Sequence, residues 1–463
     1  RVASRKRRVW RINWEHFNAD LQDCNLEIFS KSNDVDAMIS EWYAKVFTAL
    51  DRHAPLQPPR KPRRRPCPWL CPELVSAVRQ RNKAHRLLSR SPNDVRLREQ
   101  HRTLRAAARK LDRRLRDQYF QARLQSAGKD GRKLWNTINV VTGRAKSSSP
   151  PQVPVGILSR TFGEVVHDPG RPDALCANAP AEREAPAFTE FAPVSTEDIT
   201  ALLQSVDASK ATGHDDLPGI VLRNSASILA PSLSIIFNTS LCQGCVPRQF
   251  KIANVSPLFK GGGLDPCQPT AYRPISLLPV VSRLLEKIVK AQLTSFLTDH
   301  SILPDSQFAY RKNHSTEDAL VLAVNRWLKA KYERKLTGVI FVDMSKAFDC
   351  VKHTILAQEL SDIGVGGTVQ LWFTSYLSER LQRVVVGGNC SEYVACSRGV
   401  PQGSVLGPLL FTLYIRNLRC CLPQQVTNQE FADDIAIEAS GSCEQVCSSL
   451  STAITGLSQW LED

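Results

Sequence analysis

The feature that most constrains this chain of 463 residues is a pair of acidic stretches, about ninety positions apart, that each follow apolar residues. The first stretch comprises residues 341–349 (FVDMSKAFD) and continues the apolar run 339–342 (VIFV). Because this run is rich in β-branched and aromatic side chains, it predicts a buried strand that ends at Asp343. A helix is expected directly after it, with Ser345 as its cap and apolar side chains recurring at steps of three and four. Those apolar positions are Phe348, Val351, Ile355, Leu356 and Leu360.

The second stretch, residues 431–434 (FADD), predicts a hairpin with Asp433 and Asp434 at its tip, because the extended pattern resumes directly after them. Taken alone, two aspartates between apolar residues are most often an ordinary solvated turn. Together with Asp343 they match the needs of phosphoryl transfer, which uses two divalent ions held roughly 3.5–4 Å apart by carboxylate oxygens. We therefore predict that these three aspartates are catalytic and hold two Mg²⁺ ions, with Mn²⁺ as an alternative.

A third stretch, residues 398–411 (RGVPQGSVLGPLLF), lies between the two acidic ones. With residues 255–262, 271–278 and 307–320, these motifs resemble the reverse transcriptase of non-LTR (LINE-like) retrotransposons, nearest to the jockey and CR1-like groups. The resemblance is strong from about Phe191 to the end and weaker before Ser147. Group II intron maturases share part of this pattern, but the runs FVDMSKAFD and HSTEDA favour the retrotransposon family.

The resemblance implies an α+β fold of the right-hand polymerase type, with fingers mostly from Thr196 to about Leu336 and a palm after them. It implies RNA-directed DNA synthesis, with an RNA template, a DNA primer and deoxynucleoside triphosphates as partners. Gln402 and Gly403 would touch the pair formed by template base and nucleotide, and Phe348 would exclude ribonucleotides. From the residues alone, residues 400–403 could equally be a turn before a core helix, and Phe348 a core side chain.

The triphosphate of a nucleotide needs cationic side chains, and the resemblance places Lys260, Arg273, Arg311 and Lys346 near it. Arginine suits this task because its planar fork of donors matches phosphate oxygens. The alternative for each of these residues is an ordinary solvated surface charge.

The basic charge of the chain is concentrated in residues 60–146, which hold 25 Lys and Arg against 6 Asp and Glu, whereas the whole chain has a net charge of +15. Within this segment, apolar residues from Leu97 to Tyr119 recur at helical spacing and predict one long helix. Its other faces are basic and are predicted to bind a nucleic-acid backbone without sequence preference. The alternative is a solvated charged helix. The basic residues are Arg105, Arg109, Lys110, Arg113, Arg114 and Arg116.

These observations divide the chain into four parts. Residues 1–59 form an N-terminal segment, 60–146 a basic helical region, 147–190 an irregular linker without a helical pattern, and 191–463 the fingers and palm. We expect the endonuclease and the thumb of such elements to be missing here. The linker and Arg416, where related proteins have a small polar residue, favour an alternative: an inactive or domesticated relic that only binds nucleic acid.

No apolar stretch is long enough to span a membrane or to act as a secretory signal, so an intracellular location, in nucleus and cytoplasm, is expected. The chain has 14 cysteines, but none of their pairs has a second cysteine or histidine pair at zinc-finger spacing. Reduced thiols are therefore expected rather than a zinc site.

Overall fold

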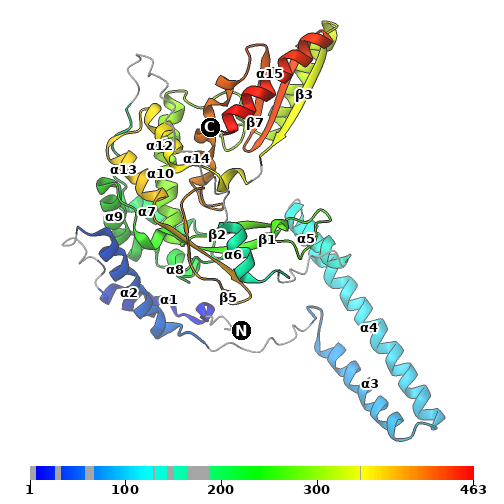
Figure 1. Ribbon diagram of the computed structural model, residues 1–463. Coiled ribbons are helices and arrows are strands. Elements are labelled where there is room, and N and C mark those ends of the chain that lie inside the picture. The colour runs from blue at the N-terminus through cyan, green and yellow to red at the C-terminus, as the bar shows by residue number, and fades with distance from the viewer. Residues whose placement is uncertain are drawn as a thin grey trace. The chain divides into compact units, whose positions relative to one another are not determined.

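The computed structural model describes residues 7–24, 26, 33–57, 67–128, 131–142, 151–163, 187–344 and 346–462 (Figure 1). It has two compact units, one made of residues 1–59 and 151–463 and the other of residues 60–150. Helices and two β-sheets occur together, and helices predominate, so the fold class is α+β. Within the described residues, no helix is both long and apolar enough to cross a membrane.

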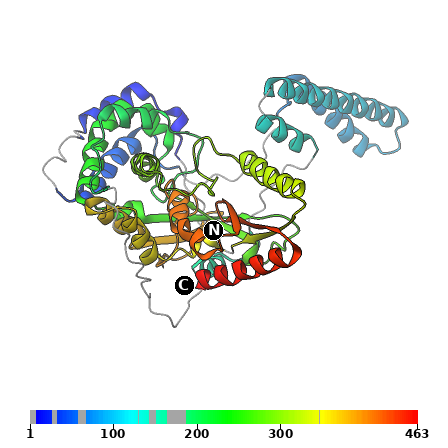
Figure 2. The same cartoon turned by 90° about the horizontal axis from the view of Figure 1, so that it is seen from above.

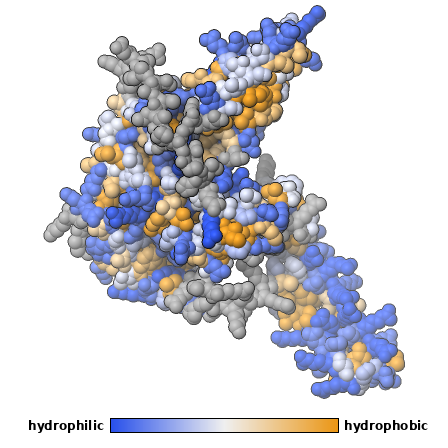
Figure 3. All heavy atoms as spheres, in the orientation of Figure 1, coloured by the Kyte–Doolittle hydropathy of each residue, from blue (hydrophilic) through white to orange (hydrophobic). Residues whose placement is uncertain are grey.

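The smaller unit is built from the helices α3 (Pro72–Arg90), α4 (Val95–Ala127) and α5 (Gly131–Val141). Asp94 begins α4, because its carboxylate accepts hydrogen bonds from the backbone N–H of Arg96 and Leu97. Few side chains of α3 and α4 are buried, and Figure 3 shows hydrophilic side chains over most of the visible face of these two helices. The long basic helix predicted from the apolar spacing is confirmed.

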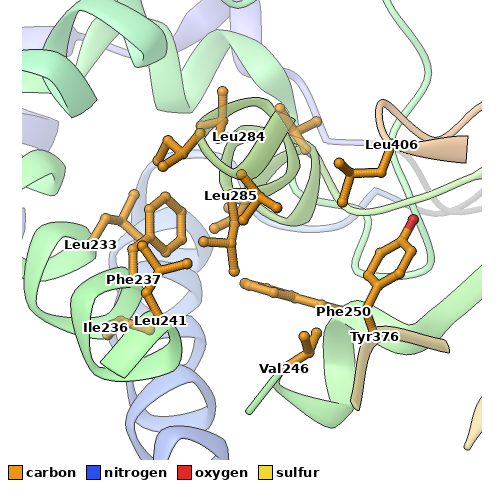
Figure 4. Packing of buried hydrophobic residues seen from close by; sticks show 14 of the residues in the cluster. Leu233, Ile236, Phe237, Leu241, Val246, Phe250, Leu284, Leu285, Tyr376 and Leu406 are labelled. Atoms are coloured by element: carbon orange, nitrogen blue, oxygen red, sulfur yellow. The ribbon is translucent and has the colours of Figure 1, made fainter. Parts of the chain in front are cut away.

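The core of the larger unit is helical. Leu233 and Phe237 of α9 (Ala226–Gln243) pack against Leu284 and Leu285 of α10 (Val280–Asp299), as Figure 4 shows. The N-terminal segment joins the same core, because Trp42 of α2 (Val35–His53) is fully buried and its indole donates to Ser232 Oγ at 3.1 Å. The other described α-helices of this unit are α1 (Trp14–Asp23), α6 (Val155–Gly163), α7 (Thr196–Gln204), α8 (Gly219–Asn224), α11 (Thr316–Tyr332), α12 (His353–Asp362), α13 (Gly367–Leu377), α14 (Gly407–Tyr414) and α15 (Cys443–Glu462).

The first sheet has five strands, in which β1 (Ile252–Phe259) lies between β2 (Tyr272–Leu277) and β4 (Arg380–Val386). The β1–β2 pair is antiparallel, whereas β1 and β4 run parallel. Two short strands, β5 (Asn389–Cys390) and β6 (Val394–Cys396), pair with β4. This sheet brings residues 252–277 next to residues 380–396, which are more than a hundred positions later in the chain.

The second sheet has three antiparallel strands in the order β3 (Leu336–Asp343), β8 (Asp434–Gly441) and β7 (Val426–Phe431). Helix α15 covers one face of it, and Figure 2 shows this helix running alongside the strands. The apolar side chains of that face, among them Val342, Ile435 and Ile437, pack with Ala453 and Leu457 of the helix. The predicted strand that ends at Asp343 and the predicted hairpin that carries Asp433 and Asp434 are both confirmed. The expectation that this strand is buried is wrong, because α15 covers only one face of the sheet and every residue of β3 is exposed or half-exposed.

Two expectations about helices are wrong. The segment 147–190 was expected to lack a helix, but α6 spans Val155–Gly163, and its Leu158 is buried against Val255 and Val384 of the first sheet. Packing on the sheet, rather than a pattern along the nine residues, stabilises this helix. Residues 164–186 lie outside the described part of the chain.

The helix expected directly after Asp343 begins only at His353. Lys346 has a positive φ of 54°, and a single 3-10 turn, Ala347–Asp349, follows it, so the chain turns sharply before α12 begins. Ser345, the predicted cap, lies outside the described residues.

Candidate active site

Two of the three predicted metal ligands lie directly opposite each other on neighbouring strands. Asp343 is the last residue of β3, Asp434 is the first of β8, and the two are partners in the antiparallel register. Opposite residues of an antiparallel pair point to the same face, with Cβ atoms about 4.5–5.5 Å apart. Both side chains are exposed, so their oxygens remain accessible.

Asp433 belongs to the two-residue turn between β7 and β8. The preceding residue, Ala432, has φ 58°, a left-handed conformation that costs an L-residue other than glycine about 1–2 kcal/mol. Such strain persists only where surrounding contacts impose it, and it is concentrated at functional sites. The turn places a third carboxylate next to the Asp343–Asp434 pair in sequence.

The chemistry of this donor set fits divalent ions that prefer oxygen ligands, because it offers only carboxylates and they are accessible. In the part of the chain that the structure describes, however, no three acidic, histidine or cysteine side chains converge closely enough to form one metal site. The pair Asp343 and Asp434 is therefore brought together by the register, whereas Asp433 is placed beside it by the turn.

The sheet has one open face and one buried face at this site. Phe341, two residues before Asp343 and on the same face, is 76% exposed. The opposite face packs on α15. A carboxylate pair at the end of an open, partly apolar face is accessible to a large ligand, which a buried pair would not be.

A buried hydrogen-bond network that the sequence did not reveal holds the turn in place. Gln307 is 0% exposed, and its Oε1 accepts hydrogen bonds from the backbone N–H of Ala432 (3.1 Å) and Ala309 (2.9 Å). Its Nε2 donates to Glu430 Oε2 at 3.2 Å. The Glu430 side chain is 1% exposed, and burial raises its pKa while hydrogen bonds from Ser306, Asn428 and Gln307 oppose that rise.

The backbone strengthens this connection. Phe308 N–H donates to the Glu430 carbonyl at 2.9 Å, and Glu430 N–H donates to the Ser306 carbonyl at 2.8 Å. Residues 306–308 thus form a parallel bridge to β7. The segment 304–311 and the turn that carries Asp433 are consequently held as one piece.

Arg311, a predicted phosphate ligand, lies in the segment 304–311 that is bonded to this turn. Its Nη1 donates to the carbonyls of Pro304 (2.7 Å) and Gln307 (3.3 Å), so the guanidinium links the two ends of the loop 304–311 through hydrogen bonds. The neighbouring Tyr310 has a pKa raised by burial and, to a smaller degree, by the charge of Asp433. Arg311 therefore lies near the aspartates, and its role towards a nucleotide stays a prediction.

A second group of predicted residues gathers around Asp349. Gln402 Nε2 lies 3.1 Å from both carboxylate oxygens of Asp349. Burial raises the pKa of Asp349, and the Gln402 hydrogen bond and the charges of Lys346 and Lys260 oppose that rise. Lys346 Nζ also donates to the Thr161 carbonyl of α6 at 3.3 Å. Lysines from two distant segments thus approach the same carboxylate.

The remaining predicted residues lie on the elements next to this group. Phe348 stacks on Phe411 with ring centroids 4.6 Å apart and remains half-exposed. Arg273 is exposed on β2, and Gly403 follows Gln402 with φ 114°. The sequence placed all of these residues in one site; the structure keeps them in the same unit, in one group around Asp349 and another near Asp433.

Known proteins resemble this chain. Residues 260–463 match the family model described as "Reverse transcriptase (RNA-dependent DNA polymerase)". The "Probable RNA-directed DNA polymerase from transposon BS" of Drosophila melanogaster is 31% identical over 58% of this chain. The "RNA-directed DNA polymerase from mobile element jockey" is 30% identical over 63% of the chain in Drosophila melanogaster, and 27% identical over 93% in Drosophila funebris.

Residues 260–463 are therefore similar to reverse transcriptases, and the chain is similar to RNA-directed DNA polymerases of mobile elements. It spans 30%, 33% and 49% of the length of the three relatives named above. The match to the jockey protein of Drosophila funebris also shows that the resemblance reaches into the part before residue 147, as the sequence motifs predicted.

Arg416, which the sequence singled out as a departure from the pattern, is well accommodated in the structure. Its Nε lies 2.6 Å from Glu359 Oε2, and Asn417 Nδ2 donates to both oxygens of the same carboxylate, at 2.8 and 2.9 Å. Arg416 and Glu359 are both largely buried. Because the charge of Arg416 is paired with that of Glu359, this position does not favour the alternative of an inactive relic.

The predicted nucleic-acid ligands of the smaller unit are all exposed on α4. Arg105, Arg109 and Arg113 follow each other at intervals of four and therefore lie along one side of the helix. Arg114 lies 3.6 Å from Glu73 of α3, and the Arg116 guanidinium lies 5.9 Å from the ring of Trp69. The row of three arginines is thus the most open part of the predicted surface.

Proposed function

We propose that this chain carries out RNA-directed DNA synthesis, adding deoxynucleotides to the 3′ hydroxyl of a DNA primer on an RNA template. The observation that carries the proposal is the register of β3 and β8, which places Asp343 opposite Asp434 on an open face. The family match and the names of the relatives support the same reaction. In this assignment the sheet β3–β8–β7 is the palm, and the β1–β2 hairpin with residues 304–336 belongs to the fingers of a right-hand polymerase.

Asp343, Asp433 and Asp434 would hold two Mg²⁺ ions, for which Mn²⁺ is an alternative. Such ions supply positive charge to the attacking hydroxyl and to the leaving pyrophosphate. Asp343 and Asp434 contribute by presenting oxygens from two strands whose spacing is fixed by backbone hydrogen bonds. Gln307 contributes by holding the backbone of the turn that carries Asp433.

The nucleotide would lie between the aspartates and the group around Asp349. Lys260, Arg273 and Lys346 would neutralise its phosphates, with Arg311 near Asp433. Phe348 would stand against the sugar, where a ring supported by Phe411 could exclude a 2′ hydroxyl. Gln402 and Gly403 would contact the base pair.

Primer extension on a homopolymeric RNA template with Mg²⁺ tests the proposal. The wild-type chain is compared with Asp433→Asn/Asp434→Asn and with Asp362→Asn, an exposed carboxylate of α12 that serves as the matched control. We expect incorporation by the wild type and the control and none by the double variant. Equal incorporation by all three chains would refute the metal assignment, and no incorporation by any would refute the activity of this chain.

A second function, binding of a nucleic-acid backbone by α4, is favoured by the exposed row Arg105, Arg109 and Arg113. It is also the activity that would remain if the chain were a relic that does not polymerise. Because phosphate binding releases counterions, the affinity should fall steeply with salt. RNA binding with a steep salt dependence, together with no incorporation, would favour this alternative. We further propose an intracellular location, where RNA and deoxynucleotides are present.

A further inference from the structure

The orientation of the Gln402 amide is decided by its neighbour. An ionised carboxylate has no proton to donate and can only accept hydrogen bonds. Because both oxygens of Asp349 lie 3.1 Å from the same atom of Gln402, that atom must be the amide nitrogen, Nε2. Burial raises the pKa of Asp349, and the Gln402 hydrogen bond and the charges of Lys346 and Lys260 oppose that rise by favouring the ionised form. The amide oxygen, Oε1, therefore points away from the carboxylate.

The backbone around Gln402 is held from two sides, which leaves only its side chain to be oriented. Ser276 N–H donates to the Gln402 carbonyl at 2.7 Å, and Val400 N–H donates to the Phe348 carbonyl at 2.8 Å. A Cβ on Gly403, which has φ 114°, would lie 2.7 Å from the Ser276 carbonyl oxygen. The loop therefore fits between β2 and the turn after β3 only with glycine at this position.

The Gln402 side chain faces an opening in the protein. Asp349 and Gln402 line a cavity of about 80 Å³, together with Ser276, Ser397 and Arg398. Within the described part of the chain, no donor reaches Gln402 Oε1. A polar atom that is fixed in direction and lacks a partner is suited to bind a donor group of a ligand.

We propose that Asp349 is a positioning residue that orients Gln402 so that its Oε1 accepts a hydrogen bond from the incoming nucleotide. This inference rests on the proposed polymerase function and assigns to Asp349 a role beyond it. The donor on the nucleotide is either the sugar 3′ hydroxyl or an amino group of the base. Asp349 itself touches Gln402 and is not a metal ligand in this assignment.

A double-mutant cycle on the full chain tests the proposal. In Asp349→Asn the new side chain can both donate and accept, so the Gln402 amide is free to flip. In Gln402→Met the amide is absent. Losing one hydrogen bond of about 1–1.5 kcal/mol should raise the nucleotide KM about five- to tenfold in either variant, with kcat changed less than twofold. The double variant should be no worse than Gln402→Met alone.

The cycle separates orientation from charge. Removing the Asp349 charge beside Lys346 and Lys260 also changes the attraction for the triphosphate, but that effect persists when Gln402 is methionine. Only the orientation effect disappears in the Gln402→Met background. Additive increases in KM would overturn the proposal. Asp362→Asn is the control, because Asp362 accepts a similar bond from Gln358 at 2.7 Å on the surface of α12.

The source of the donor is distinguished by repeating the cycle with a 2′,3′-dideoxynucleotide. If the effect of Asp349→Asn disappears, the donor is the 3′ hydroxyl, and if it persists, the donor is on the base. Thermal unfolding of each variant shows whether it is folded, and the isosteric Asp349→Asn should change the midpoint little.

A binding experiment distinguishes failure of this inference from failure of the proposed polymerase function. If the wild-type chain extends no primer, the cycle is measured as equilibrium binding of a deoxynucleotide to the complex of chain, template and a primer that ends in a dideoxynucleotide. Binding that Asp349→Asn weakens only when Gln402 is present would support the inference without any catalysis. Binding that neither variant changes, or no binding at all, would overturn it.

Discussion

The sheet that carries the aspartates and the hairpin of α3 and α4 use polar side chains in opposite ways. In the sheet and the turn after β3, Gln307 and Glu430 are buried, Asp349 is half-buried, and all three are paired through hydrogen bonds. On α4, the arginines are exposed and form few contacts. The function of the first region should therefore depend on the exact positions of its side chains, so that a single substitution abolishes it. Nucleic-acid binding by the second region should depend on the sum of its charges, so that it weakens gradually as salt is raised.

Among changes outside the three aspartates, the largest effect is expected from Gln307→Leu. The change leaves the N–H groups of Ala432 and Ala309 and one oxygen of Glu430 without their partner, and each unsatisfied buried group costs about 1–3 kcal/mol. We expect a loss of about 3 kcal/mol in the free energy of unfolding and a fall in primer extension of at least about tenfold. Denaturant unfolding and single-nucleotide addition measure the two effects.

The matched control is Gln370→Leu in α13, which removes one hydrogen bond to the Ala357 carbonyl. It should lower stability without a comparable loss of extension. Equal loss of extension in both variants would mean that Gln307 acts through general stability, and the contrast between the two regions would lose its main support.

A buried acid should also make the larger unit sensitive to pH. Burial raises the pKa of Asp215 to about 6, while the Tyr43 hydroxyl donates to it at 2.9 Å. The folded chain therefore holds a proton here that the unfolded chain has lost, between the ordinary pKa near 3.8 and about 6. This group thus lowers the free energy of unfolding as pH rises through that window, by about 3 kcal/mol in all.

Asp215→Asn removes this titration and keeps an acceptor for Tyr43. The variant should gain stability relative to the wild type as pH rises from 4 to 7, which denaturant unfolding at several pH values measures. A difference between the two chains that does not change with pH would contradict the assignment of the buried acid.

For the smaller unit, a graded effect is expected. Replacing Arg105, Arg109 and Arg113 by glutamine should reduce the slope of log affinity against log salt for RNA by about 2, because each phosphate contact contributes about 0.7 on a single strand. Replacing Lys45, Arg52 and Arg248, which pair with carboxylates in the larger unit, removes the same charge and should change the slope less. Fluorescence titrations at several salt concentrations measure both slopes. Equal slopes would show that only net charge matters.

The smallest effect is expected at a surface ion pair. Arg114→Ala, which breaks an exposed pair with Glu73, should cost less than about 0.5 kcal/mol of stability. Arg416→Ala should cost several times more, because it leaves the largely buried Glu359 without its cation. Thermal unfolding compares the two. Similar costs would remove the distinction between buried and exposed pairs.

The sequence predicted the local parts of this structure better than their connections. The apolar run before Asp343 and the extended residues around Asp433 and Asp434 predicted strand and hairpin, because strand patterns are local. The register that sets Asp343 opposite Asp434 joins segments ninety positions apart, and no local pattern specifies it.

The buried contacts that hold the turn carrying Asp433 were missed for the same reason. Gln307 reads as an ordinary polar residue, since only folding brings it to Ala432 and Glu430. Helix α6 was missed because its stability comes from packing on the first sheet. The start of α12 was misplaced because apolar spacing continues through a turn in which Lys346 has a positive φ.

The most direct test of the central claim, that Asp343 and Asp434 act as one site, is single-nucleotide addition by Asp343→Asn, Asp434→Asn and the variant with both changes. Groups that act as a unit give losses that do not add. The account predicts that each single change lowers the rate at least about a hundredfold, with RNA binding retained, and that the double variant is hardly slower. A rate that falls by the product of two modest factors, or a single variant that retains most of its rate, would contradict it.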